Sequence, residues 1–215
     1  MKSSRLIYLL ILFAAACFGC NSRSGNKEVT PAKNNGNADS LIIAQQELLA
    51  NPYAQVDVSP MDMSYYPADY PKLKMAHAVN SPPAIRVIYS RPHLGGRHLF
   101  HEVLKYGDPW RLGANEASEI QFFREVTIQG KKIGAGRYMI YCIPQAGKWT
   151  ITLNSNIDSW GLKIDSTLDI ARFDIPVKEV SHPLEYFTMI FEKADHGASL
   201  LMAWENLEAR LLIEF

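Results

Sequence analysis

Apolar and polar residues alternate in short runs through the C-terminal two thirds of the chain. Residues 85–90 alternate in this way, and further runs follow at intervals of about eight to twelve residues, a spacing typical of antiparallel β-structure. The predicted strands are 85–90, 119–123, 126–128, 137–143, 149–153, 169–177, 184–191, 199–205 and 208–215. This pattern predicts an all-β domain over residues 75–215, an antiparallel, jelly-roll-like β-sandwich of about eight to ten strands.

Turn-forming residues separate these runs. Gly130-Lys131 turns the chain after one short run, and the glycine-containing loop 144–148 is short enough to join two strands as a hairpin. Asp195-His196-Gly197 marks another turn. We therefore expect antiparallel neighbours along much of the domain and no helix longer than a turn or two.

The first twenty residues have the pattern of an export signal. Lys2 and Arg5 precede thirteen apolar residues, 6–18, which are too few to span a bilayer and enough for the core of a signal peptide. Small residues then lead to Cys20, as at sites where a lipoprotein signal is cut and the new N-terminal cysteine is acylated. The sequence predicts a lipoprotein signal peptide over residues 1–20, with Cys20 acylated.

Two alternatives stay open at this end of the chain. Cys17 also follows small residues, so it could be the acylated cysteine instead. Neither cysteine has the leucine that is usual three residues upstream, so an ordinary cleaved secretory signal also fits. In the predicted lipoprotein, Cys20 holds the chain on membrane lipid in the cell envelope, facing the periplasm, with the outer membrane favoured over the inner. The spacing of Cys17 and Cys20 is not a redox motif, because both lie in the leader.

Residues 21–74 are expected to link the anchor to the domain. Residues 21–39 are rich in Asn, Gly, Ser, Lys and Ala and have no apolar period, which is the composition of a flexible tether. Residues 40–50 could form one short helix capped by Ser40. Residues 51–74 carry four prolines among tyrosines and methionines, so we expect an extended, loop-like segment.

Composition fits this picture and excludes one class of partner. Apolar residues make up 47% and charged residues 20%, a balance that can bury a core. Loss of the leader would remove Lys2 and Arg5 but no acidic residue, leaving 20 basic against 22 acidic residues, a net charge of −2. Phosphate neutralisation needs a basic face, so the sequence predicts no nucleic-acid partner. Cys142, inside an apolar run, is expected to be a buried core thiol.

Several motifs of the domain form a family pattern. They include Ser81-Pro82, Val87-Ile-Tyr-Ser-Arg-Pro92, Gly96-Arg97, Tyr106-Gly-Asp-Pro-Trp-Arg-Leu-Gly-Ala-Asn-Glu116, Lys148-Trp-Thr-Ile-Thr-Leu-Asn154 and Trp160-Gly161. With these motifs, residues 81–215 resemble the family called domain of unknown function 2911, which is common in Bacteroidota. The resemblance implies an exported, β-rich domain and marks the Ser-Arg-Pro and Trp-Arg-x-Gly-Ala-Asn-Glu segments as its most specific motifs. It implies no activity.

The polar residues of these motifs form the best candidate site. Three guanidinium groups could bind a carboxylate, phosphate or sulfate in a bidentate manner, whereas tryptophan faces with Asn and Glu hydrogen bonds suit a sugar ring. The sequence supports an architectural role for these residues about as well as ligand binding. Arg111 could pair with Glu116, Arg91 could bond a crossing loop, and Trp110 could fill the core. The predicted ligand-binding residues are Arg91, Arg97, Trp110, Arg111, Asn115, Glu116, Asn154 and Trp160.

Other chemistry has less support in the sequence. His93, His98 and His101 are close in sequence, but on a strand His98 and His101 would point to opposite faces, and no carboxylate or cysteine completes a ligand spacing. The sequence contains no nucleophile-elbow or phosphate-loop motif. It therefore predicts no metal and no cofactor, and Glu116 is a weak catalytic candidate.

Two functions are compatible with these residues. The first is an exported, membrane-anchored lipoprotein whose β-sandwich binds a polar or anionic ligand, a glycan or a partner protein. The second is a hydrolase or isomerase acting on an envelope glycan or metabolite, with Glu116 as acid or base and Arg111 stabilising negative charge. A deep cleft lined by both side chains would favour the enzyme, and a closed ion pair would favour a structural role.

Overall fold

The computed structural model describes residues 57–215. The predicted signal peptide, Cys17, Cys20 and the predicted helix at 40–50 lie outside the described residues. The elements, in chain order, are β1 (Met61–Tyr66), α2 (Tyr70–Met75), β2 (Ile85–Ser90), η1 (Leu99–Val103), β3 (Glu119–Phe122), β4 (Val126–Ile128), β5 (Lys131–Ile133), β6 (Gly136–Gln145), β7 (Lys148–Asn154), η2 (Ser166–Leu168), β8 (Asp169–Ala194) and β9 (Gly197–Glu214). Between residues 57 and 215, no helix has both the length and the apolar character needed to cross a membrane.

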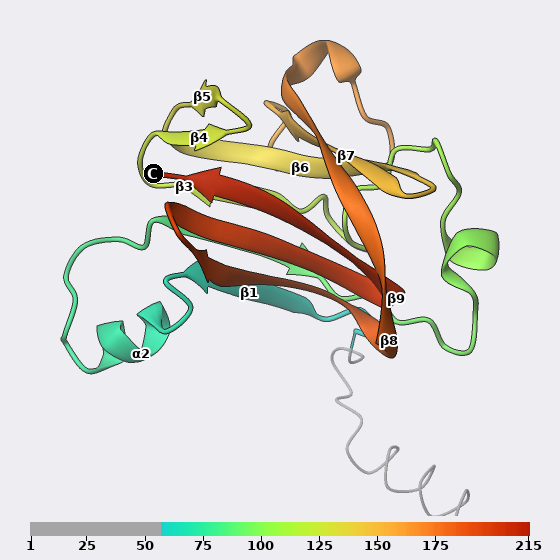
Figure 1. The fold of residues 1–215 in the computed structure, drawn as a ribbon, viewed down its shortest axis with the longest axis horizontal. Coiled ribbons are helices and arrows are strands. Elements are labelled where there is room, and N and C mark those ends of the chain that lie inside the picture. Colours follow the sequence, from blue (N-terminus) through green and yellow to red (C-terminus); the bar gives the residue numbers. More distant parts are fainter. Residues whose placement is uncertain (1–56) are drawn as a thin grey trace, which may run out of the picture. The chain divides into compact units, whose positions relative to one another are not determined.

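The nine strands of this part of the chain join in the order β1-β2-β3-β6-β7-β8-β9-β4-β5, and every pairing is antiparallel. In Figure 1, β6 and β7 form an upper layer above β8, β9 and β1. The all-β antiparallel fold predicted from the sequence is confirmed. The jelly-roll-like sandwich stays a prediction, because the hydrogen-bonded order is that of one open sheet.

The strand β8 bends and so contributes to both layers (Figure 1). Its first part pairs with β7, and its later part pairs with β9. The register against β9 shifts between Glu179 and Leu184, a stretch that contains Pro183. Proline has no backbone N–H to donate to the ladder, so a break in pairing is expected at this position.

The strand β9 bends at the same corner of the molecule. Glu205 has a φ of 51°, in the left-handed region, and it pairs with Leu184 of β8. The two ends of β9 lie side by side, because the Phe215 N–H donates to the His196 carbonyl at 3.1 Å. A Cβ on Gly197 would collide with the backbone at Ile213, so the close approach of the two ends requires glycine there.

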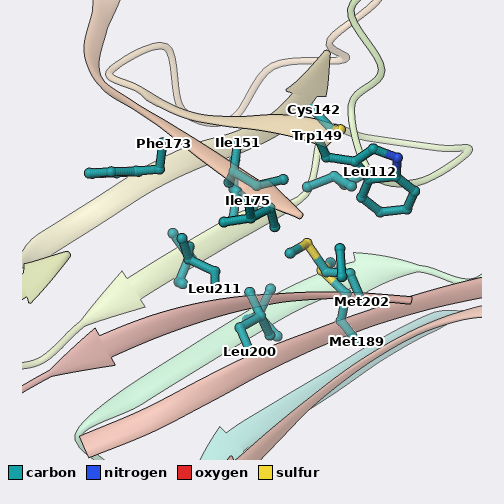
Figure 2. Packing of buried hydrophobic residues seen from close by; sticks show 14 of the residues in the cluster. Leu112, Cys142, Trp149, Ile151, Phe173, Ile175, Met189, Leu200, Met202 and Leu211 are labelled. Atoms are coloured by element: carbon teal, nitrogen blue, oxygen red, sulfur yellow. The ribbon is translucent and has the colours of Figure 1, made fainter. Parts of the chain in front are cut away.

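One hydrophobic core fills the space between the layers. Inward side chains of β7 and the first part of β8 face those of the later part of β8 and of β9 (Figure 2). Trp149, Ile151, Leu200, Met202 and Leu211 are fully buried in it. Burial of one such side chain stabilises the fold by roughly 1.5–3 kcal/mol, so alternation along each strand decides which face turns inward.

The thiol of Cys142 lies in this core, as the sequence predicts. It is fully buried, and burial raises its pKa well above the ordinary value because the thiolate would lose its hydration. The group is therefore a small apolar side chain at neutral pH, without nucleophilic character.

A second, small core lies on the outer face of β6. Ala117, Met139 and Tyr141 are buried there, with Ile143 and Ile164 packed against them. The loop 155–168 is held at its base by Asn154, Asp165 and Asp169 through side-chain hydrogen bonds. The middle of this loop, Gly161 and Leu162, lines one of the cavities described below.

Two expectations about local structure were wrong. Residues 61–74, placed by prediction in a loop-like linker over 21–74, contain β1 and all of α2 but its last residue, and β1 pairs with β2 along its whole length. The prolines that suggested a loop, Pro60 and Pro67, flank β1 without interrupting it. The four strands predicted over 169–215 are two strands that bend, β8 and β9.

Candidate functional site

A groove made of two adjoining cavities lies beside the corner where β8 and β9 bend. The cavities have volumes of about 380 Å³ and about 470 Å³, and Val58 and His93 line both. We call the two together the groove. The first cavity is lined by Val58, Ser59, Pro92, His93, Arg97, Val103, Leu104, Pro109, Trp110, Arg111, Gly113, Ala114, Gly161, Leu162 and Trp204, and the second by Asp57, Val58, Pro60, Arg91, His93 and Tyr186.

Backbone pairing beyond the end of β2 places His93 at the centre of the groove. His93 forms an isolated antiparallel bridge with Tyr186 of β8, and their rings stack with centroids 5.6 Å apart. The carbonyl of Glu185 accepts the Leu94 N–H at 3.0 Å and the Trp204 indole N–H, also at 3.0 Å. The bends of β8 and β9 thus bring residues distant in sequence to one wall of the groove.

Trp110 forms the apolar wall of the first cavity. It is 8% exposed, and its ring packs against those of Trp149, Phe187 and Trp204. Its indole N–H donates to the Gly113 carbonyl at 3.2 Å, which satisfies the one polar atom of the side chain. The residue therefore fills the core, as its architectural role predicts, and it also lines the cavity, while its contact with a ligand stays a prediction.

The loop that follows Trp110 is fixed by Ser90 at the end of β2. The Ser90 hydroxyl oxygen accepts the N–H groups of Ala114 at 2.6 Å and Asn115 at 3.1 Å. Gly113 is required here, because a Cβ would lie 2.8 Å from the Ser90 Oγ. Only the small Ser90 side chain fits between the loop and the strand, which explains the small residues in this motif.

Asn115 holds the N-terminal segment of the described chain against this loop. Its Nδ2 donates to the Asp57 carboxylate and to the Ser59 carbonyl, the latter at 3.1 Å. Asn115 itself is absent from the cavity walls, so its role in the structure is to position Asp57, Val58 and Ser59, which do line the groove.

Arg97 and Arg111 are the two guanidinium groups of the first cavity. Arg97 donates to the carbonyls of Leu94 at 2.7 Å and His93 at 3.0 Å. Arg111 donates to the carbonyls of Ala114 and Trp160. Within residues 57–215, neither arginine has a carboxylate within 4.0 Å, so both positive charges are held in place by neutral acceptors.

The environment of Arg111 is the less hydrated of the two. Its Nε is buried and has no hydrogen-bond partner among the described residues. Burial lowers the pKa of the Arg111 guanidinium below its ordinary value, and the charge of Glu116 opposes this shift in part. The group stays charged at neutral pH, and an unpaired, partly desolvated cation favours an anion beside it.

Arg91 lines the second cavity and also holds neighbouring strands together. Its guanidinium donates to the Phe187 carbonyl at 3.3 Å and to Thr188 Oγ1 at 3.2 Å, and it pairs with Asp62 at 3.4 Å. It also lies over the Tyr186 ring, 6.0 Å from the centroid. Unlike Arg97 and Arg111, Arg91 has a carboxylate partner, so its charge is already compensated.

Tyr89 lies beneath Arg91 in the same polar cluster. Its hydroxyl accepts the Met189 N–H at 2.9 Å and donates to Asp62 at 3.4 Å. Burial, as the largest cause, raises the pKa of Tyr89 to about 12, while the Met189 hydrogen bond opposes the shift. The phenol is therefore neutral at physiological pH and links β1, β2 and β8 by hydrogen bonds.

Besides Asn115, three predicted site residues lie outside the walls of the groove. Glu116 is exposed, and within residues 57–215 its carboxylate has no hydrogen bond or ion pair. Asn154 is fully buried at the base of the loop 155–168, where its side chain bonds Asp165, Asp169 and Asn156. Trp160 is 54% exposed and reaches the site only through its carbonyl, which accepts from Arg111.

The histidines do not gather in the described part of the chain. No group of three or more His, Cys, Asp or Glu side chains between residues 57 and 215 is arranged to hold a metal ion. His98 precedes the π-helix η1, and His101 lies within it, so this segment is not the strand considered above. His98 instead lies 3.6 Å from Glu205 at the bend of β9.

Most of the groove residues were not among the predicted ligand-binding residues, and five examples show why. Asp57 and Val58 fall in the predicted linker, and His93 was considered only as a metal ligand. Tyr186 and Trp204 lie on strands whose pairing brings them here from more than ninety residues away. Unlike these, Arg91, Arg97, Trp110 and Arg111 belong to the motifs singled out in the sequence, and they do line the groove.

The fold and the groove define an all-β protein with a cationic surface groove walled by tryptophan. A model of the family described as "Protein of unknown function (DUF2911)" matches residues 71–213, well over half of the chain. The chain belongs to this family, and the resemblance drawn from its motifs is confirmed. No curated protein and no solved structure gives a significant match.

Proposed function

We propose that the protein is a binding module of the cell envelope whose groove takes a ligand with a phosphate or carboxylate group. The observation that carries this proposal is the pair Arg97 and Arg111 in one cavity, each without a carboxylate partner in the described chain. Guanidinium groups favour planar, bidentate contact with such anions. Because neutral carbonyls already orient both side chains, little conformational entropy would be lost on binding.

The composition of the walls supports the same class of ligand. Trp110 and Trp204 offer apolar edges, and the stacked pair of His93 and Tyr186 lines the second cavity. A ligand with an acidic group in the first cavity could place an uncharged ring or chain against this pair. Ligand sites of this kind combine apolar walls with a few convergent polar groups.

The enzymatic alternative has less support. An acid or base catalyst needs a partner that orients it and sets its pKa, and it must reach the bound substrate. Glu116 is exposed, makes no hydrogen bond within residues 57–215, and is not a wall residue. We therefore propose binding, with Glu116 acting on Arg111 only through its charge.

A titration with inorganic phosphate, followed by the Nε–H resonances of the arginines, tests the proposal. We expect the Arg97 and Arg111 signals to shift in a saturable way. The Arg210 signal should not move, because this exposed arginine already pairs with Glu192 and Glu208 on another surface. Potassium chloride at equal ionic strength controls for general screening. Uniform small shifts of all three signals, or none, would contradict a specific site.

The proposal also includes export and anchoring. We propose that the chain is acylated at Cys20 and held in the envelope, as its first twenty residues suggest. Cys20→Ser should move the protein from the membrane fraction to the soluble envelope fraction, measured by fractionation and blotting. Cys17→Ser is the matched control and should leave the protein on the membrane. Release by Cys17→Ser alone would assign the anchor to Cys17 instead.

A further inference from the structure

Exposed apolar side chains lie at the mouth of the groove and on the loop beside it. Five large hydrophobic residues in the described chain are more than half exposed, and three of them are Leu162 at 73%, Val58 at 70% and Trp160 at 54%. Leu162 and Val58 line the first cavity, and Gly161 between Trp160 and Leu162 does too. We call Val58, Trp160 and Leu162 the apolar rim. Single exposed apolar residues are ordinary, whereas a group beside a site marks a contact surface.

The rim is held in place by the scaffold. The Trp160 carbonyl accepts from Arg111 at 3.4 Å, and the Ser159 carbonyl accepts the Ala117 N–H at 3.0 Å. Gly161 has a φ of 70°, and a Cβ there would lie 2.8 Å from the Ala117 Cβ, so the loop fits closely against the wall. An apolar surface kept exposed by a fixed backbone implies a partner that covers it.

The position of the rim in the chain indicates which partner that is. Val58 is the second described residue, and Asn115 binds its neighbour Asp57, so the described part of the chain begins at the groove. Thirty-six residues, 21–56, separate Asp57 from the proposed anchor at Cys20. A chain tethered at that cysteine would be confined near the membrane, and this confinement raises the effective concentration of the rim at the lipid surface.

We propose that the apolar rim inserts into the membrane surface, so that Arg97 and Arg111 meet the phosphates of lipid headgroups. Tryptophan prefers the headgroup level of a bilayer, where its ring is partly apolar and its N–H stays hydrated. Leu162 and Val58 would enter the boundary of the acyl chains, and the exposed Lys163 beside Leu162 would stay among the headgroups. The inference rests on the proposed anion site and names the source of the anion.

Tryptophan fluorescence tests this docking directly. The chain has four tryptophans, and the other three are at most 8% exposed, so Trp160 is the one that lipid can reach. The full acylated chain is reconstituted into vesicles of phosphatidylethanolamine and phosphatidylglycerol, with and without bromine on the acyl chains. We expect brominated lipid to quench most of the Trp160 emission, obtained as the difference between the wild-type chain and Trp160→Phe.

A matched pair of variants distinguishes insertion of the rim from a general effect of placing a charge at any exposed apolar position. Leu162→Asp should abolish most of the quenching, because an aspartate in the rim opposes insertion. Met75→Asp is the control, since Met75 is 78% exposed but belongs to α2, at the far side of the molecule from the β8–β9 corner in Figure 1. Trp160 emission unchanged by brominated lipid would overturn the docking proposal, whether or not the chain floats with the vesicles.

Failure of the membrane docking can be told apart from failure of the anion site. If soluble phosphate shifts the Arg97 and Arg111 signals while Trp160 stays unquenched, the groove binds anions from solution and the membrane inference fails alone. If Trp160 is quenched and soluble phosphate shifts neither arginine, the rim contacts lipid without a headgroup site, and the part of the proposal that concerns headgroups is overturned.

Discussion

A substitution at Asn154 tests most directly whether a predicted site residue supports the fold or contacts a ligand. The sequence motifs place it among the ligand-binding residues, whereas its side chain is fully buried and used entirely within the fold. Nδ2 donates to the Asp165 carbonyl at 2.9 Å and to the Asp169 carboxylate at 2.8 Å, and Oδ1 accepts the Asn156 N–H at 2.8 Å. Asn154→Ala removes all three bonds at once.

The expected cost of this substitution follows from those bonds. Two neutral hydrogen bonds contribute about 1 kcal/mol each and the bond to a carboxylate about 2 kcal/mol, so the free energy of unfolding should fall by about 4 kcal/mol. Urea denaturation followed by circular dichroism measures it. Asn80→Ala, at an exposed asparagine whose side chain makes no hydrogen bond among the described residues, should change stability by less than about 0.5 kcal/mol.

A small effect would refute this reasoning. If Asn154→Ala lowers the free energy of unfolding by less than about 1 kcal/mol while weakening phosphate binding, Asn154 is a ligand contact and the loop 155–168 is held by other means. If the substitution destabilises the protein as expected, the residual folded protein should still bind phosphate. That combination assigns Asn154 to the support of the loop carrying Trp160 and Leu162.

Two further predictions concern the scaffold under the groove. Because burial raises the pKa of Tyr89 to about 12, the folded protein keeps this proton while the unfolded chain loses it near pH 10. The free energy of unfolding should therefore fall between pH 10 and 12, by up to roughly 3 kcal/mol, and Tyr89→Phe should remove that part of the pH dependence in urea titrations. An unchanged slope would contradict the buried phenol. Gly113→Ala should destabilise the protein by about 1–3 kcal/mol, because its Cβ would displace the Ser90 hydroxyl that bonds the N–H groups of Ala114 and Asn115. Equal urea midpoints for Gly113→Ala and wild type would show that the loop has room.

The strands were predictable where the hydrophobic pattern is local. Residues 85–90 and 126–128 match β2 and β4 as predicted, and the run 149–153 lies within β7, because alternation along one strand decides which face is buried. β1 was missed, since Met and Asp are weak strand formers and its partner is β2, joined only through a loop and α2. Nothing in the local sequence of 61–66 reports that pairing.

It was harder to predict that a strand continues through a bend than to predict the strand itself. Pro183 divides the pattern of β8 into two runs, and the bend at Glu205 divides that of β9 into two. The pattern alone does not show that each strand continues through this point. Continuity through a bend depends on tertiary pairing, which overrides local preference. It is this bend that carries Tyr186 and Trp204 to the groove.

The candidate site was predictable only in part, because some of its residues are close in sequence and others meet only through tertiary pairing. Arg97, Trp110 and Arg111 belong to motifs close in sequence and were found, while His93 and Tyr186 meet through a bridge between distant segments. Residue type could not separate Arg111, which faces the cavity, from Asn154, which supports a loop behind it. Only the direction of each side chain distinguishes a contact from a support.

The central claim is that Arg97 and Arg111 form one anion site, and the affinity for inorganic phosphate tests it most directly. In calorimetric titrations at constant ionic strength, we expect saturable binding to the wild-type protein and a loss of about tenfold or more in affinity for Arg97→Gln and for Arg111→Gln, as expected when a charge-assisted hydrogen bond is removed. Arg210→Gln, with the same charge change elsewhere, should bind as the wild type does. Equal affinities for all four proteins, or no binding by any, would contradict the account.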